Sequence, residues 1–414
     1  MRIGMLRRIP VATIALACMS IVMVLAYRAL LGSDPEPVKN DQVQYLALAR
    51  GLLDRGEFTR AVHGEPFVPE SLRYPGYPVF VALVCRTVGC DHVADTQAVL
   101  LAIMVVLVVR FARPLLGARG ALVSGALVAL NPAFGYFAAL RLSDTLAALL
   151  LVTASATMVT LVERPSLVRA SACGLLLGAL AMTRPFFLPL PLLLVLLAFF
   201  ARDRWRSLAV PALVLLAAFG FATLPMVAYS ISNFGRPLTG GSGVQLWQGY
   251  FQGLSRDNLD AFEREQVDLG VESIDREASL TDRPAQAYAF AALDEELRRR
   301  AIDLIRHDPF GWIRRGVIRS IELWGGDPPA RDGGATLSAT ARGIWYAGNL
   351  AFLGIGVIGA ARLIRRPLPP AVVPLAIVMF VWILSFPFLA EGRYSLPAKP
   401  FLAIGVVAAL SRRQ

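Results

Sequence analysis

The sequence has few of the side chains on which metal- and nucleotide-dependent enzymes rely. Among its 414 residues there are only 3 histidines and 4 cysteines, and neither group has the spacing of metal ligands. It contains no GxGxxG segment after a strand and no P-loop, so a nucleotide-binding fingerprint is missing. It also lacks an internal repeat. These absences argue against zinc sites, against Rossmann and P-loop enzymes, and against transporters built from inverted repeats.

Charged residues are also scarce, whereas apolar residues are abundant. Asp, Glu, Lys and Arg make up 17% of the chain, and apolar residues make up 56%. The apolar residues fall in runs of about 20, the length that crosses a lipid bilayer as a helix. The sequence therefore predicts an all-α, polytopic membrane protein. The net charge of +11 fits arginine-rich cytoplasmic loops, and we expect no binding to nucleic acid.

The apolar runs predict ten membrane spans. The first is expected to be retained, because it is too long for a signal-peptide core and no A-x-A cleavage site follows it. The run 79–89 is too short to span and is predicted to lie in the membrane interface. The predicted spans are 10–31, 94–111, 121–139, 145–162, 167–183, 185–201, 208–231, 344–361, 371–389 and 396–410.

The arginines define the orientation of these spans. With a cytoplasmic N-terminus, every cytoplasmic connection is short and basic, as the positive-inside rule requires. Both termini are then cytoplasmic in a plasma membrane, for which the composition suggests a bacterial inner membrane. The chain divides into a module 1–231 that includes the extracytoplasmic loop 32–93, a second extracytoplasmic loop 232–343, and C-terminal spans 344–414. The cytoplasmic arginines are Arg2, Arg7, Arg8, Arg110, Arg113, Arg119, Arg164, Arg169, Arg202, Arg204, Arg206, Arg362, Arg365, Arg366, Arg412 and Arg413.

The two long loops contain two helical patterns. Residues 40–58 are amphipathic, and a carboxylate, Asp41, stands in the first turn. A second amphipathic pattern covers 284–306 and stops at "HDPFGW", whereas the glycine-rich opening of the second loop predicts irregular structure. Cys85 and Cys90 lie in the first loop. A spacing of five on a helix would aim them apart, so we do not expect a disulfide.

The polar residues that the spans leave unexplained gather on the extracytoplasmic side. Ionisable groups at span ends are costly, and they therefore suggest function. A guanidinium group binds phosphate bidentately, through two N–H groups, and a carboxylate can act as general base, so the mixture fits a reaction on an anionic lipid headgroup. Simpler roles exist: Asp41 as a helix-dipole charge, Asp144 as a helix cap, and Arg184 and Arg393 as cations that extend to the membrane interface. The set comprises Asp41, Arg73, Arg141, Asp144, Arg184, Glu391, Arg393 and Lys399.

Several short motifs follow one another in a fixed order over nearly the whole chain. They are "DQVQYLALARGLLDRGEF", "RYPGYPVFVAL", "ALNPAFGYFAALRLSDTLAALLL", "MTRP", "NFGRPLTGGSGVQLWQG", "HDPFGWIRRGVIRSIELW" and "EGRYSLPAKP". This order resembles the GT-C superfamily of integral-membrane glycosyltransferases, in the branch of the protein O-mannosyltransferases and the lipid A aminoarabinose transferase. The resemblance implies transfer of a hexosyl or pentosyl group from a polyprenyl-phosphate donor to a lipid, glycan or protein acceptor, with inversion.

The resemblance also implies a role for each matched residue. Asp41 matches the family's first-loop Asp, the candidate general base, and Asp144 matches the acidic residue between the third and fourth spans. The residues that it places near the donor phosphate are Arg73, Arg393 and Tyr394, which Arg184 would assist.

Two departures from the family pattern bear on metal binding. Gln42 follows Asp41 where many relatives have a second acid, and Leu72 stands where an acid often precedes the proline motif, with Glu70 two positions earlier. No cofactor is therefore firmly implied, and a divalent cation is left possible.

Other functions stay open at this stage. A transporter or flippase of lipid-linked substrates would place its polar residues near the bilayer midplane, and a membrane scaffold would leave the convergence of charges unexplained. A polymerase or ligase that moves whole glycans is not separated from a single-sugar transferase. The expected partners are a polyprenyl-phosphate-linked sugar, the lipid bilayer and an unknown acceptor.

Overall fold

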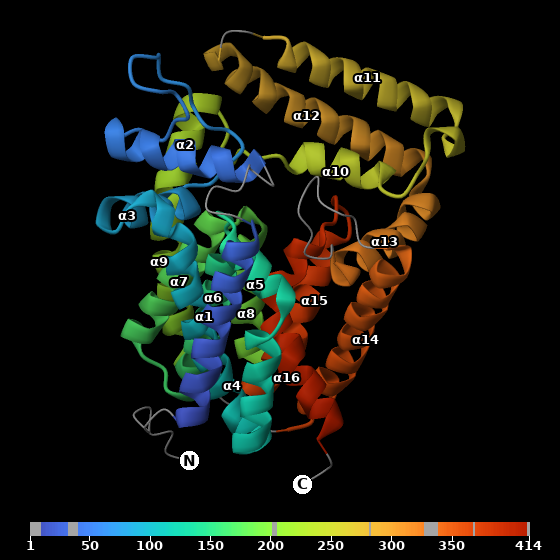
Figure 1. The fold of residues 1–414 in the computed structure, drawn as a ribbon. Helices are drawn as coiled ribbons and strands as arrows, with labels where there is room; N and C mark the ends of the chain where they lie inside the picture. Colours follow the sequence, from blue (N-terminus) through green and yellow to red (C-terminus); the bar gives the residue numbers. More distant parts are fainter. Residues whose placement is uncertain are drawn as a thin grey trace.

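The computed structural model describes residues 10–31, 40–200, 205–280, 283–326, 338–366 and 369–411. In these ranges every regular element is an α-helix or a short 3-10 helix (Figure 1). The predicted all-α fold is confirmed. Of the arginines that were assigned to the cytoplasmic side, Arg2, Arg7, Arg8, Arg202, Arg204, Arg412 and Arg413 lie outside the described residues.

Long apolar helices form a bundle. Five of the described helices are long and apolar enough to cross a membrane: α1 (Val11–Leu31), α4 (Val93–Ala129), α6 (Asp144–Glu163), α9 (Trp205–Phe234) and α14 (Ala339–Leu363). Shorter apolar helices pack among them, namely α7 (Leu167–Thr183), α8 (Leu190–Phe200) and α15 (Val373–Ser385). The short apolar helix α16 (Lys399–Leu410) packs against α14 and α4. The chain is therefore a multi-pass membrane protein. The number of ten spans and the three-part division of the chain stay predictions.

The bundle differs from the predicted spans at helix breaks. The region predicted as 94–111 and 121–139 begins as one helical stretch, α4, which bends at Gly117 where φ is 72°. That stretch ends at Ala129, and α5 (Pro132–Ala139) then begins because Asn131 caps it. Three other predicted spans open as 3-10 turns, namely η2 (Pro185–Phe187) before α8, η4 (Pro369–Ala371) before α15 and η5 (Gly392–Ala398) before α16.

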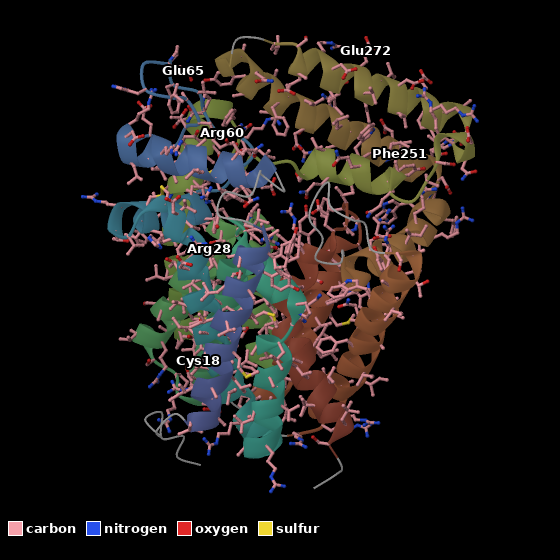
Figure 2. All side chains as sticks on the ribbon, in the orientation of Figure 1. Cys18, Arg28, Arg60, Glu65, Phe251 and Glu272 are labelled. Carbon is pink, nitrogen blue, oxygen red and sulfur yellow. A yellow bond between two sulfur atoms is a disulfide. The ribbon has the colours of Figure 1, made fainter. Side chains whose placement is uncertain are left out.

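The helices of the two long loops lie across one end of the bundle, which we call the loop end (Figure 1). The first loop supplies α2 (Asn40–Asp54), α3 (Gly76–Thr87) and the turn η1 (Cys90–His92). The second supplies α10 (Ser242–Phe251), η3 (Arg256–Asn258), α11 (Ala261–Ala278), α12 (Arg283–His307) and α13 (Pro309–Gly325). The labelled side chains Arg60, Glu65 and Glu272 lie at this end, whereas Cys18 lies along α1 (Figure 2). The start of α1 and the end of α16 lie at the opposite end (Figure 1).

The predicted loop helices are present, but the loops contain more structure than expected. The helix predicted over 40–58 ends at Asp54, and the one predicted over 284–306 corresponds to α12. The irregular opening expected for the second loop is wrong from Ser242 onward, where α10 begins. α10 forms because Trp247 and Tyr250 pack against Leu297 and its neighbours on α12.

Cys85 and Cys90 form a disulfide, so the expectation that they point apart is wrong. The expectation assumed one continuous helix. α3 instead ends at Thr87, and Gly89 with φ of 101° turns the chain before η1. This backbone conformation is open to glycine, and it brings Cys90 back beside Cys85.

Candidate active site

Asp41 lies between two guanidinium groups from distant parts of the chain. Arg73 Nη2 is 2.5 Å from Asp41 Oδ1, and Arg393 Nη1 is 2.9 Å from Asp41 Oδ2. Asp41 stands in the first turn of α2, Arg73 precedes α3, and Arg393 belongs to η5. All three side chains are largely buried. Both oxygens of the carboxylate are thus engaged by cations.

This arrangement controls the ionisation of Asp41. Burial alone would raise the pKa of its carboxyl group, but the charges and hydrogen bonds of Arg73 and Arg393 outweigh burial and lower the pKa below its ordinary value. Asp41 is therefore a carboxylate at neutral pH. A carboxylate held in this way is a weak base until its partners are drawn away.

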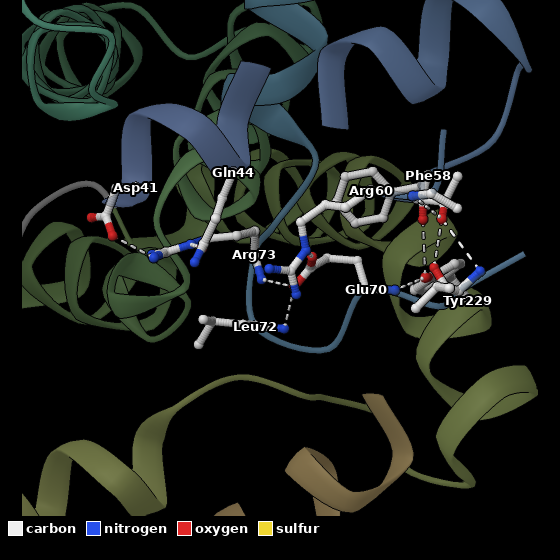
Figure 3. A network of polar contacts seen from close by, with 11 residues as sticks. Asp41, Gln44, Phe58, Arg60, Glu70, Leu72, Arg73 and Tyr229 are labelled. Carbon is white, nitrogen blue, oxygen red and sulfur yellow. Dashed lines mark hydrogen bonds and ion pairs between the residues drawn. The ribbon is translucent and has the colours of Figure 1, made fainter. Parts of the chain in front are cut away.

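Arg73 is oriented by α2. Its Nε donates a hydrogen bond of 2.8 Å to Gln44 Oε1, and both residues are drawn in Figure 3. The Arg73 guanidinium also lies 5.4 Å from the centre of the Tyr45 ring. Gln44 and Tyr45 follow Asp41 in the same helix. One face of α2 therefore presents the carboxylate together with two groups that hold its cationic partner.

A second ion pair forms between Asp144 and Arg184. Arg184 Nη2 is 2.5 Å from Asp144 Oδ1, and its Nε donates to Ser143 Oγ at 3.2 Å. Asp144 opens α6 and is only 1% exposed. Its other oxygen, Oδ2, is buried and has no hydrogen-bond partner among the described residues. The helix-cap alternative for Asp144 does not describe this geometry, because its carboxylate faces Arg184.

Tyr394 joins the two ion pairs. Its ring centre lies 5.7 Å from the Arg184 guanidinium and 5.4 Å from that of Arg393. Arg393 also pairs with Glu391, Nε to Oε2 at 2.7 Å. Burial would lower the pKa of Arg393, but nearby carboxylates, Asp144 first among them, raise it. Three carboxylates and three guanidiniums thus share one site, and their charges balance.

The structure brings the six predicted site residues together and leaves two other members of the predicted charged set outside. Arg141 lies near Asp91, Nη2 to Oδ1 at 3.8 Å, and its backbone N–H donates to Gln42 Oε1. Lys399 is buried at the start of α16, with Nζ 3.4 Å from Asn349 Oδ1. The six residues that converge are Asp41, Arg73, Asp144, Arg184, Arg393 and Tyr394.

The donor set does not fit a divalent cation. Among the residues that the structure describes, no three His, Cys, Asp or Glu side chains come together as metal ligands do. Asp41 and Asp144 each face a guanidinium, which would repel a cation at the same oxygen. We therefore assign no step to a metal.

Comparison with known proteins identifies the architecture. Residues 79–229 match the family model of dolichyl-phosphate-mannose-protein mannosyltransferases. The oligosaccharyltransferase AglB from Archaeoglobus fulgidus, in complex with an inhibitory peptide and a dolichol-phosphate, is 13% identical with a TM-score of 0.57 over 96% of this chain and 50% of that chain. The apo form of the A. fulgidus oligosaccharyltransferase gives 14% identity, a TM-score of 0.58 and the same coverage. This chain has the GT-C fold. The resemblance found in the sequence is confirmed at this level.

The GT-C match is partial in length and distant in sequence. The chain spans about half the length of the archaeal structures, 50% of each. ArnT from Cupriavidus metallidurans bound to undecaprenyl phosphate is 15% identical over 94% of this chain and 77% of that chain, with a TM-score of 0.42. No curated protein matches. The family match includes Asp144 and Arg184 but not Asp41, Arg73 or Arg393.

Sequence reasoning missed the residues that hold the arginines in place. Gln44 was not singled out, although it stands three residues after Asp41 on the same helix face, which is a signal of contact. Glu70 was noted only as a departure from the family pattern. Its side chain is wholly buried and contacts the backbone of Arg73.

Proposed function

We propose that this protein transfers a sugar from a polyprenyl-phosphate donor to an extracytoplasmic acceptor with inversion at the anomeric carbon. The acceptor is a lipid, a glycan or a protein, and the sugar is a hexose or a pentose. The observation that carries the proposal is the position of Asp41 between Arg73 and Arg393. A phosphate offers the same pair of anionic oxygens to the same two guanidiniums.

The lowered pKa of Asp41 requires an explanation if it is the general base. In the free protein its two oxygens neutralise Arg73 and Arg393. When the donor arrives, its phosphate competes for these guanidiniums and releases Asp41. The pKa of the carboxyl group then rises because burial remains while its positive partners turn to phosphate. Donor binding would thus convert a weak base into a stronger one.

The reaction then follows from the positions of these groups. Asp41 takes the proton of the acceptor hydroxyl or amine, and the acceptor atom bonds to the anomeric carbon on the face opposite the phosphate. The bond between that carbon and the phosphate oxygen breaks, and its electron pair stays on polyprenyl phosphate. Arg73 and Arg393 stabilise this leaving anion, an electrostatic contribution of about 3 kcal/mol for each well-placed donor.

Asp144 and Arg184 would form the other side of the site. The buried, unpartnered Oδ2 of Asp144 can accept a hydrogen bond from an acceptor hydroxyl and so orient it. Arg184 would lie close to the phosphate, because its guanidinium and that of Arg393 both contact the ring of Tyr394. The lipid tail would lie among the bundle helices and the second loop would cover the acceptor.

The disulfide supports an extracytoplasmic position for the loop end. Cys85 and Cys90 lie in the first loop on the same side as Asp41. Disulfides persist outside the cytoplasm and are rare within it. With the loop end outside, both termini would face the cytoplasm of a plasma-membrane protein, as the arginine distribution predicts.

The test uses the purified full chain in lipid nanodiscs with a panel of radiolabelled polyprenyl-phosphate sugars. Donor consumption and release of polyprenyl phosphate are measured for the wild type, Asp41→Asn and Arg393→Ala. Turnover of at least one donor by the wild type, lost in Asp41→Asn while donor binding survives, is the expected result. Wild-type turnover by Asp41→Asn would overturn the base assignment, and absence of donor binding would overturn the proposed function.

A further inference from the structure

Glu70 is a buried carboxylate that the proposed reaction does not use. It lies between α2 and α3, three residues before Arg73, and its side chain is 0% exposed. An ionised group in such a place is costly unless its oxygens are fully engaged. Its partners therefore show what it does.

The carboxylate of Glu70 holds the backbone that carries Arg73. Oε1 accepts hydrogen bonds from the backbone N–H of Leu72 at 2.7 Å and of Arg73 at 3.0 Å. Oε2 pairs with Arg60 Nε at 2.6 Å. Figure 3 shows these contacts side by side with the Arg73–Asp41 pair. Glu70 thus closes a tight turn from which the Arg73 side chain extends toward Asp41.

The same turn is attached to the bundle through Tyr229 of α9. The backbone N–H of Glu70 donates to Tyr229 Oη at 2.6 Å, and Tyr229 Oη donates to the Phe58 carbonyl at 3.2 Å (Figure 3). The rings of Phe58 and Tyr229 also meet edge to face, 5.6 Å apart. Through Tyr229, α9 of the membrane bundle therefore fixes the position of the turn relative to the bundle.

The far side of the turn is fixed against α7. A Cβ on Gly76 would lie 2.6 Å from the backbone of Met182 and Thr183, so the chain after Arg73 passes in direct contact with the end of that helix. Arg184 follows Thr183 immediately. Arg73 is thus held between two anchors, Glu70 with Tyr229 on one side and the residue next to Arg184 on the other.

We infer that Glu70 is a positioning residue, which acts through Arg73 to place a guanidinium against the donor phosphate. The inference rests on the proposed function, because it takes the ligand of Arg73 to be that phosphate. Glu70 itself touches no substrate. Its carboxylate accepts hydrogen bonds from the backbone N–H groups of Leu72 and Arg73, and these set the direction of the Arg73 side chain. Arg60 neutralises the charge of the Glu70 carboxylate.

The test is a double-mutant cycle on binding of polyprenyl phosphate by the full chain in nanodiscs. Glu70→Ala is expected to weaken binding about tenfold, because Arg73 loses its fixed direction. In an Arg73→Ala background the same change is expected to have no further effect. Glu70→Gln keeps a carbonyl oxygen for the two backbone N–H groups and is expected to bind within about threefold of the wild type.

Glu263→Ala is the matched control. Glu263 is also a buried carboxylate that accepts a backbone hydrogen bond, from Asp260, but it lies on α11 of the second loop. Its removal is expected to lower the melting temperature without changing the affinity for polyprenyl phosphate. This separates a loss of general stability from a loss of positioning. Tyr229→Phe, which removes the hydroxyl that holds Glu70, is the second variant if Glu70→Ala does not fold, and it is expected to weaken binding in the same direction.

The outcomes separate the inference from the proposed function. If Arg73→Ala weakens binding and Glu70→Ala adds to it by the same factor as in the wild type, Glu70 does not act through Arg73 and the inference fails. The inference also fails if neither Glu70→Ala nor Tyr229→Phe changes affinity. If the wild type does not bind polyprenyl phosphate, or Arg73→Ala binds it as the wild type does, the proposed donor site fails first.

Discussion

Arg393 Nη1 lies 2.9 Å from Asp41 Oδ2, so a residue close to the end of the chain completes a site that opens in the first loop. The contact joins η5 to the first turn of α2 across the loop end. Because Arg73 holds the other oxygen, Asp41 occupies the place that we assign to a phosphate. In the protein without donor, the Asp41 carboxylate is thus the anion that lies between the two guanidiniums.

Removal of that anion is expected to improve donor binding. In Asp41→Asn a neutral amide no longer competes for Arg73 and Arg393, so polyprenyl phosphate should bind about tenfold more tightly while turnover is lost. Affinity is measured by titration of nanodisc-embedded protein. Asp268→Asn, which takes a carboxylate from an exposed pair with Arg256, is the matched control and should bind as the wild type does. Weaker binding by Asp41→Asn would contradict a competition between carboxylate and phosphate.

The lowered pKa of Asp41 makes a prediction about pH. The pH profile of kcat/KM reports ionisations of the free protein, in which Asp41 stays ionised below its ordinary pKa of 3.8. The acidic fall in kcat/KM that is due to Asp41 is therefore expected below that pH. In Arg73→Gln one positive partner is gone while burial remains, so the fall should move to higher pH. A wild-type fall near neutral pH that Arg73→Gln does not move would assign it to another group.

Removal of only one partner of the Asp144–Arg184 ion pair is expected to destabilise the fold strongly. Arg184→Ala leaves the carboxylate of Asp144 buried without its cation, which typically lowers the free energy of unfolding by about 3–5 kcal/mol. Asp144→Asn in the same chain should recover part of that loss, because the uncompensated charge is then removed. Thermal unfolding in detergent measures both. Arg256→Ala, which breaks an exposed pair, should cost no more than about 1 kcal/mol.

The sequence predicted those members of the candidate site whose charge is energetically unfavourable next to a membrane. A charged residue at the end of a predicted membrane span needs a reason, so Asp144, Arg184 and Arg393 could be singled out from hydropathy alone. The sequence could predict that these charges gather on one side, but it could not predict which residue pairs with which, because the partners come from separate segments of the chain. The simple snorkelling role for Arg184 and Arg393 is not what the structure has, because both guanidiniums pair with carboxylates.

Long-range contacts explain what the sequence could not predict. α10 begins in a glycine-rich segment because Asp294 of α12 accepts hydrogen bonds from the backbone N–H groups of Gly243 and Val244, at 2.8 and 3.0 Å. The local sequence of a helix start cannot predict a capping residue that comes from another helix. Glu70 is similar, since its position was visible but its orientation depends on Tyr229 of a distant span. The local propensities of both segments were overruled by tertiary contacts.

Close packing of α14 on α16 is expected to depend on glycine. A Cβ on Gly359 would lie 1.8 Å from the carbonyl oxygen of Gly405, so Gly359→Ala must push the two helices apart. We expect it to lower the free energy of unfolding by about 1–3 kcal/mol. Gly348→Ala on the same helix is the control, because nothing lies within 4 Å of its Cβ position. Equal melting temperatures for the two variants would mean that α14 and α16 can move apart without a loss of stability.

Labelling of cysteines tests which side of the membrane the loop end faces. In the wild type the disulfide leaves no thiol at Cys85 or Cys90, whereas Cys85→Ser frees the thiol of Cys90. A membrane-impermeant maleimide should then label Cys85→Ser on intact cells and leave the wild type unlabelled. Ser411→Cys, at the opposite end of the bundle after α16, should react only after the cells are opened. The variant Cys85→Ser/Cys90→Ser controls for the remaining thiols of Cys18 and Cys173. The reverse pattern, with Ser411→Cys labelled on intact cells and Cys85→Ser protected, would place the arginine-rich connections outside and contradict the proposed orientation.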